Sequence, residues 1–127
     1  MAIEKSHHIA LKTGKYKEMK AFYTETLGFE IVGVFPGSDT LFIDIGGTTI
    51  EMGRGDVPAD RPDPVGGFVH LAFQVDSVQA TYDELVAKGV DSWYIEPKTV
   101  RPGIAVAFFR DPDGNALELF ESTSLRW

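Results

Sequence analysis

Two short stretches of this sequence carry the same order of residue types after a histidine. Residues 8–12 (HIALK) read histidine, apolar, alanine, apolar, polar, and residues 70–74 (HLAFQ) read the same. Further along each half, a single glutamate interrupts an apolar run. Imidazole and carboxylate groups together suit hard or borderline divalent metal ions. The candidate metal ligands are His8, Glu51, His70 and Glu118.

The alternation of polar and apolar residues places each of these four residues on the face of its strand that points away from the core. Residues 68–75 (FVHLAFQV) predict a strand, in which His70 shares a face with a small and a polar residue while the apolar side chains face the other way. Glu51 and Glu118 each lie between two apolar residues, so both carboxylates point away from the core. Pseudo-twofold pairing of the halves would bring two imidazoles and two carboxylates together. Such a set fits a six-coordinate ion with two positions left for water or substrate.

The elements that must position these residues also repeat. Each half predicts a strand, a helix that ends at a glycine, and three further strands. In the first half these are a strand at 9–12, a helix at 16–27 and strands at 29–35, 40–45 and 48–52. In the second half they are a strand at 68–75, a helix from Asp76 or Ser77 to Lys88, and strands at 92–95, 104–110 and 116–121. Two such βαβββ modules, at about 6–53 and 67–121, flank a proline- and glycine-rich connector at 54–66.

The composition and charge of the chain limit the kinds of partner that it is expected to bind. The chain has 127 residues, of which 43% are hydrophobic and 24% charged, as expected for a single globular domain. It has no cysteine, which excludes thiolate ligands, and no apolar run or signal sequence for a membrane or for export. A net charge of −7 and a pI of about 4.8 argue against nucleic acid and anionic membranes. We therefore expect a cytoplasmic protein whose partner is a small molecule.

Several motifs are similar to those of one known superfamily. They are residues 8–11 (HIAL), 22–29 (FYTETLGF), 50–51 (IE), 70–75 (HLAFQV) and 111–119 (DPDGNALEL). They resemble the vicinal oxygen chelate superfamily, which includes glyoxalase I, bleomycin-resistance proteins and extradiol dioxygenases, over nearly the whole chain. The resemblance implies one glyoxalase/bleomycin-resistance/dioxygenase domain over residues 1–127. Its expected fold is α+β, with two βαβββ modules forming a cup-shaped mixed sheet, helices on the outer face and a metal that chelates two neighbouring substrate oxygens. A homodimer is also implied.

Members of this superfamily differ in the ligands that they keep. Dioxygenases and fosfomycin-resistance enzymes resemble one another in using two histidines and one glutamate, which match His8, His70 and Glu118. Glyoxalase I also keeps a glutamate at the position of Glu51, and bleomycin-binding members dispense with the metal set. Glu51 therefore favours a glyoxalase I-like lyase or isomerase. The alternatives are an Fe(II)-dependent extradiol-type dioxygenase and a non-catalytic binding or resistance protein.

The glyoxalase resemblance also implies a mechanism. A divalent ion (Ni, Co, Zn, Mn or Fe) would bind the two oxygens of a 2-oxo-aldehyde thiol adduct and stabilise the enediolate formed when the carbon-bound proton is removed. The resemblance assigns Glu118 as the base and Glu51 as the residue that returns the proton on the other side. Lys12 stands where an arginine that anchors glutathione is expected, which leaves the thiol open.

Other residues admit two interpretations. His7 is expected on the face opposite to His8, in a surface or capping role, if the strand includes it. Lys98 and Arg101 lie in a predicted loop, 96–103, and either hold an anionic end of the substrate or are solvated charges. Five aromatic residues form either the floor of a pocket or part of the core: Phe42, Trp93, Tyr94, Phe108 and Phe109.

Overall fold

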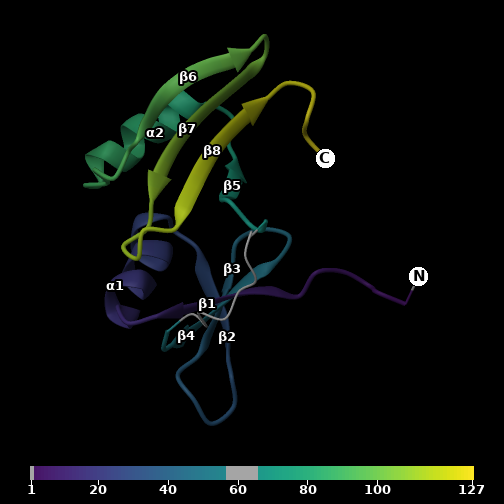
Figure 1. Ribbon diagram of the computed structural model, residues 1–127, viewed down its shortest axis with the longest axis vertical. Helices are drawn as coiled ribbons and strands as arrows, with labels where there is room; N and C mark the ends of the chain where they lie inside the picture. Colours follow the sequence, from purple (N-terminus) through teal and green to yellow (C-terminus); the bar gives the residue numbers. More distant parts are fainter. Residues whose placement is uncertain (1, 57–65) are drawn as a thin grey trace. The chain divides into compact units, whose positions relative to one another are not determined.

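The chain folds into two compact units, Met1–Val65 and Gly66–Trp127, in a computed structural model that describes residues 2–56 and 66–127. Each unit contains a four-stranded mixed sheet and one helical segment (Figure 1). This arrangement confirms the predicted α+β class and the order of two βαβββ modules. Residues 57–65, most of the predicted connector, lie outside the described residues.

The first unit runs strand, helix, strand, strand, strand. Its elements are β1 (His8–Thr13), α1 (Tyr16–Ala21) with a π-helical turn η1 (Phe22–Thr26), β2 (Glu30–Val34), β3 (Leu41–Asp44) and β4 (Thr49–Arg54). The strand order in the sheet is β1-β4-β3-β2. Strands β1 and β4 are parallel, whereas the two other pairs are antiparallel. The strand that carries His8 therefore lies beside the strand that carries Glu51.

The second unit repeats this topology. Its elements are β5 (Leu71–Gln74), α2 (Val78–Ala87), β6 (Ile95–Arg101), β7 (Ile104–Arg110) and β8 (Ala116–Ser122). The sheet order is β5-β8-β7-β6, and again the first and last strands pair in parallel. The strand that follows His70 thus lies beside the strand that carries Glu118.

Burial separates the two faces of each sheet. In β4, Ile50 and Met52 are fully buried, and in β8, Leu117 and Leu119 are 2% exposed. Helix α1 contacts β4, and α2 contacts β7 and β8, so each helix covers a face of its own sheet. The glutamates between these apolar residues project from the opposite face, as the alternation predicts. None of the described helices is long and apolar enough to cross a membrane.

Local capping explains where the helices begin and end. The Ser77 hydroxyl accepts a hydrogen bond from the Ala80 amide, which makes Ser77 the N-cap of α2. A carboxylate oxygen of Glu121 accepts a bond from the Val78 amide at 2.8 Å, so β8 also stabilises this helix start. At the end of the first helical segment, Gly28 has φ of +81°, a conformation that favours glycine. The predicted helix end is therefore correct.

The first helical segment is less regular than its apolar spacing predicts. A single α-helix was expected over 16–27, but its second half is π-helical, and the Leu27 amide bonds to the Phe22 carbonyl. The π-helical turn adds one residue to the hydrogen-bonded ring. Tyr23 in this turn is 1% exposed, so the segment still contributes to the core.

The first strand of the second unit is shorter than predicted. A strand was expected over 68–75, but β5 begins at Leu71, and Phe68 and Val69 are exposed. The pairing with β8 explains the difference, because Leu71 is opposite Leu117 and β8 begins only one residue earlier. Residues before His70 consequently have no strand partner in β8. His70 therefore immediately precedes β5 and is not part of it.

The prediction for residues 92–103 was wrong in detail. Strand β6 spans Ile95–Arg101, where a loop was expected, and the predicted strand at 92–95 overlaps it by one residue. Pro97 does not interrupt β6, because β6 is an edge strand, where a residue without an amide proton is tolerated. Its pairing with β7 also shifts register between Ile95 and Lys98. Lys98 and Arg101 are therefore strand residues.

Candidate metal centre

The first unit brings His8 and Glu51 together on the face opposite its helix. In the register of β1 and β4, Ala10 is the direct partner of Glu51, and His8 is the partner of Thr49. Because alanine is small, the imidazole two residues earlier can approach the carboxylate diagonally. Nε2 of His8 lies 3.8 Å from Oε2 of Glu51. The first repeated pair thus forms within one unit.

The second unit builds the same pair more tightly. Ala72 is the partner of Glu118, and Nε2 of His70 lies 2.9 Å from Oε1 of Glu118, within hydrogen-bond distance. The Glu118 side chain is 9% exposed, whereas that of Glu51 is 23% exposed. The alanine of each repeated sequence motif therefore has a physical role, because it leaves room between the two donors.

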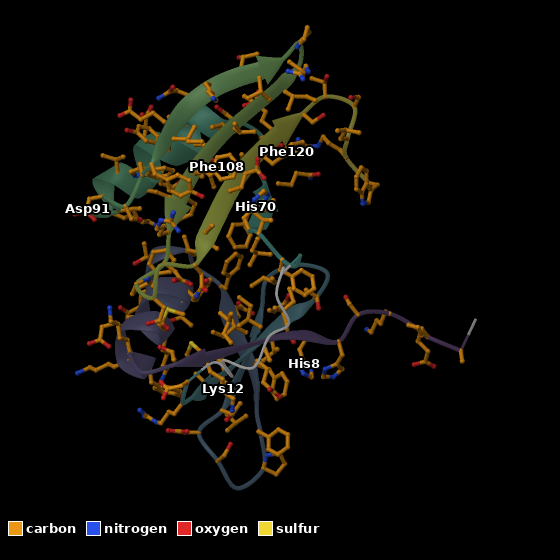
Figure 2. The ribbon with its side chains drawn as sticks, viewed as in Figure 1. His8, Lys12, His70, Asp91, Phe108 and Phe120 are labelled. Atoms are coloured by element: carbon orange, nitrogen blue, oxygen red, sulfur yellow. The ribbon has the colours of Figure 1, made fainter. Side chains whose placement is uncertain are left out.

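A phenylalanine completes each pair. Phe42 in β3 is the partner of Glu51, and Phe108 in β7 is the partner of Glu118. Each ring meets the neighbouring histidine edge to face, with centroids 5.7 Å apart for His8 and 5.2 Å for His70. Figure 2 shows His70 and Phe108 in the second unit. This repetition is not visible in the residue order, because the spacing from histidine to phenylalanine differs between the halves.

The remaining aromatic residues divide between the two faces. Phe109 is fully buried and stacks on Trp93 at 4.7 Å, and Trp93 contacts Tyr82 of α2 at 4.6 Å. Tyr94 instead contacts Phe108 at 5.7 Å. Phe109 and Trp93 thus belong to the core beneath α2, while Tyr94 extends the aromatic surface beside His70.

Burial governs the charge of Glu118. Desolvation raises the pKa of Glu118 above its usual value of 4.5, and the nearby His70, by its charge and its hydrogen bond, partly opposes the rise. A carboxylate buried with one imidazole partner still has lone pairs to offer a cation. This environment makes Glu118 a good candidate both to bind a metal ion and to accept a proton.

The donors of both pairs fit a divalent metal ion by their chemistry. Each unit offers one imidazole nitrogen and one carboxylate oxygen on the same face, and the chain has no thiolate. Within residues 2–56 and 66–127, however, no group of three or more histidine, aspartate or glutamate side chains lies together. Each unit by itself therefore brings together one imidazole and one carboxylate.

His7, an exposed residue, was expected to face away from His8 only if the strand included it. Strand β1 begins at His8, so the alternation that would turn His7 to the other face does not reach it. Instead, Nδ1 of His7 lies 2.9 Å from Nδ1 of His8, and both rings contact Phe42. The two adjacent histidines are evident in the sequence, but the exact start of β1 determines which way the side chain of His7 points.

The two basic residues of β6 have different surroundings. Lys98 is the register partner of Val106 in β7, two residues before Phe108 on the same strand. The Arg101 guanidinium donates to the carbonyl of Val100 at 2.8 Å, a local contact within its own strand. Lys98 is thus the better placed of the two for an anionic group near the aromatic surface.

The fold and the donor pairs agree with a sequence match to a known family. The model of the Glyoxalase/Bleomycin resistance protein/Dioxygenase superfamily matches residues 5–119, and the chain belongs to this superfamily. YwkD of Bacillus subtilis (strain 168) is 35% identical over 130 residues, which cover 95% of this chain and 99% of YwkD. A probable lactoylglutathione lyase of Synechocystis sp. is 27% identical over 126 residues, with 92% and 95% covered.

A solved structure of similar shape has a different description. TnmS3, an antibiotic binding protein from Streptomyces sp. CB03234, aligns with a TM-score of 0.74 at 28% identity, over 97% of this chain and 99% of TnmS3. Relatives of this chain thus include a probable enzyme and a binding protein.

Proposed function

We propose that this protein is a metal-dependent, glyoxalase I-like lyase or isomerase that acts on a 2-oxo-aldehyde thiol adduct or a related substrate with two neighbouring oxygens. The observation that carries the proposal is the matched pair in each unit, in which a histidine and a glutamate meet on the same face of equivalent strands. His8, Glu51, His70 and Glu118 are the proposed ligands of one divalent ion. The similarity to the probable lactoylglutathione lyase supports this choice of reaction.

The proposed chemistry divides between the ion and the chain. A bound divalent ion supplies Lewis-acid polarisation of the two substrate oxygens, which acidifies the carbon-bound hydrogen between them. Glu118 is the proposed acceptor of that proton, since it is the more buried of the two carboxylates. Glu51, the equivalent residue of the other unit, returns a proton to the neighbouring carbon. His8 and His70 hold the ion and the carboxylates in place.

The aromatic side chains beside the donor pairs restrict the chemical class of the proposed substrate. Phe42 lies next to His8, and Phe108 lies next to His70, so an apolar ring covers one side of each donor pair. Tyr94 extends the surface next to Phe108. Such walls accept the hydrocarbon part of a small substrate, while the ion would hold its polar end. A small organic molecule is the proposed partner, and the proposal includes a cytoplasmic homodimer.

A binding protein without catalysis is the second candidate, because the similarity to the antibiotic binding protein TnmS3 covers 97% of the chain. The two candidates differ in what the carboxylates must do. A binding protein needs no proton transfer at Glu51 or Glu118, whereas the enzyme needs both.

Metal analysis followed by an activity assay tests the proposal. Protein purified without added metal should contain about one divalent ion per set of four ligands. After loading in turn with Ni, Co, Zn and Mn, it should convert the hemithioacetal of methylglyoxal with at least one common thiol. If no metal and no thiol supports turnover, the glyoxalase-like activity is rejected. Metal binding without turnover would favour a dioxygenase or a binding protein.

A further inference from the structure

A cavity of about 340 Å³ lies at one end of the sheet of the first unit, where the chain enters β1 and β3 turns into β4 (Figure 1). Its walls come from residues 5–7, from Val32 of β2, and from residues 44, 48 and 49 around the β3–β4 turn. Cavities that hold small molecules usually measure about 300–1,000 Å³, so this one has room for a small ligand. None of its lining residues is a proposed metal ligand.

Two side chains of opposite charge line this cavity. Lys5 brings an ammonium group and Asp44 brings a carboxylate. None of the ion pairs among the described residues joins the two. Oδ1 of Asp44 accepts a hydrogen bond of 2.8 Å from the Gly46 amide, which holds the carboxylate in place, and a carboxylate has further lone pairs for a second donor. The cavity therefore offers one partner for a cation and one for an anion.

A β-bulge in β2 supplies an apolar wall. Ile31 and Gly33 of β2 are opposite two consecutive residues of β3, 43 and 42, so β2 has one extra residue at this point, which is Val32. Bulges of this kind change the direction of a side chain. Val32 is 56% exposed and lines the cavity. The irregular residue of the edge strand is thus the one that meets the cavity.

Two threonines at the β3–β4 turn complete the walls. The Thr49 hydroxyl donates a hydrogen bond of 2.8 Å to the carbonyl of His7, which fastens the segment before β1 to β4. The hydroxyl oxygen of Thr48 is buried without a hydrogen-bond partner, and it is the only such side-chain atom within residues 2–56 and 66–127. Buried polar atoms normally have partners. Because Thr48 lines the cavity, rotation about its χ1 would bring this hydroxyl to a bound ligand.

We propose that this cavity binds a free α-amino acid with a small apolar side chain. The Lys5 ammonium holds the carboxylate of the ligand, Asp44 holds its ammonium group, the Thr48 hydroxyl bonds to one of the two, and the side chain lies against Val32. A ligand with a single charge would leave Lys5 or Asp44 without a partner and would be repelled by the other. The site does not rest on the proposed function, since it uses none of the four proposed metal ligands.

Titration of the full-length protein with L-valine, followed by ¹H–¹⁵N NMR, tests the site. Valine at up to about 10 mM should cause saturable shifts of the amide signals of Val32, Gly46 and Thr48. N-Acetylvaline lacks the ammonium charge, and valine methyl ester lacks the carboxylate charge. Each should bind about tenfold more weakly than valine, because each loses a hydrogen bond between charged groups.

Two variants remove the charges from the protein side. Lys5→Gln and Asp44→Asn should each weaken valine binding by about tenfold. The asparagine oxygen can still accept the bond from the Gly46 amide, so the turn is kept. Lys17→Gln and Glu25→Gln are the matched controls, because they remove the same charges at exposed positions outside the cavity. Both controls should bind valine as the wild type does.

Thr48→Val tests the buried hydroxyl. It should weaken valine binding but leave the thermal stability of the free protein unchanged or higher, because the lost hydroxyl has no partner there. Valine binding of wild-type strength in Thr48→Val would remove Thr48 from the site.

Three results would overturn the site: no saturable shift with valine, N-acetylvaline or the methyl ester binding as tightly as valine, or an equal loss of affinity in the control variants. Amino acids also chelate metal ions, so a further variant separates the cavity from the metal centre. His70→Ala removes a proposed metal ligand of the other unit and should bind valine as the wild type does. Loss of binding in His70→Ala would assign the valine to the metal centre and overturn the cavity site.

Discussion

His70 and Glu118 form the tighter of the two donor pairs, with Nε2 of the imidazole 2.9 Å from a carboxylate oxygen of Glu118, whose side chain is 9% exposed. The equivalent atoms of His8 and Glu51 are 3.8 Å apart and more exposed. The two units therefore present the same chemical groups in different electrostatic surroundings. This asymmetry supports giving the two carboxylates different tasks, with the buried one as the base.

The first prediction concerns the stability of the metal-free protein as a function of pH. Burial raises the pKa of Glu118 in the folded state above its usual 4.5. The protonated form therefore favours folding: its contribution is fully present below the unfolded pKa and is lost as the pH rises through the folded pKa. Glu118→Gln stays neutral throughout. In thermal unfolding, the stability of the variant relative to wild type should increase over this pH range and then level off.

Glu51→Gln is the matched control for that experiment, since it alters the equivalent carboxylate at a more exposed position. Comparing the two variants shows whether the pH dependence comes from the buried carboxylate. A difference between wild type and Glu118→Gln that stays constant or shrinks with rising pH would contradict the prediction.

The second prediction concerns metal content. His8→Ala and His70→Ala each remove one of the four proposed ligands, and each variant should lose the ion on purification. Elemental analysis of the protein after gel filtration measures this directly. Gln74→Ala, on the same side of β5 as His70, is a control that should keep the metal. Full retention in either histidine variant would remove that histidine from the ligand set.

The third prediction separates the glyoxalase-like reaction from a dioxygenase. In Glu51→Gln the amide oxygen can still bind the ion, but it cannot carry a proton to the substrate. Turnover of a hemithioacetal should fall by about 10²-fold or more. A dioxygenase would need only His8, His70 and Glu118, so catechol cleavage would be unchanged or improved. Steady-state kinetics on both substrates, with metal content measured in parallel, distinguishes these results.

The fourth prediction concerns the turn between β7 and β8. Asp111 is 4% exposed, and its carboxylate accepts bonds from the amides of Asp113 and Asn115 and from the side chain of Asn115, at 2.8–3.0 Å. Asp111→Ala leaves these donors without their acceptor and should cost about 2–3 kcal/mol of unfolding free energy. Urea denaturation measures the loss. Asp113→Ala, at an exposed position in the same turn, should change stability by less than about 0.5 kcal/mol.

The fifth prediction tests the expected homodimer. Strand β2 is at an edge of its sheet, and its residues Val32 and Val34 are more than half exposed. Exposed apolar edge strands favour association with another chain. Light scattering at micromolar concentration should give a dimer mass for the wild type, and Val34→Lys should weaken the dimer. Glu30→Lys adds positive charge on the same strand without removing an apolar contact, and serves as the control. A monomeric wild type would contradict the expectation.

Sequence pattern was a good guide wherever alternation decided the outcome. Ile50 and Met52 are buried and Glu51 between them is not, because a strand with one covered face obeys a period of two. Sequence pattern was a poor guide where pairing with another strand determines the ends of a strand. The length of β5 depends on where β8 begins, and β6 persists through Pro97 because it is an edge strand.

In the candidate site, too, residue types and alternation indicated some features, while others depend on strand pairing. The four proposed ligands could be named from residue types and alternation, whereas the contacts of His7 and of the two phenylalanines could not. Phe42 and Phe108 occupy equivalent register positions on β3 and β7, but their distances along the chain from the histidines differ. Only strand pairing reveals that both stand opposite a glutamate.

The parallel pairing of the first and last strands of each unit has a consequence for folding. Hairpins such as β3–β4 and β7–β8 join neighbouring segments, but β1 meets β4, and β5 meets β8, only by closing a loop over nearly the whole unit. Such long-range pairings are entropically expensive and tend to form slowly. We therefore expect each histidine to reach its glutamate late, after the rest of the sheet provides a template. On this order of events, a metal ion would meet a donor pair that the sheet had already formed.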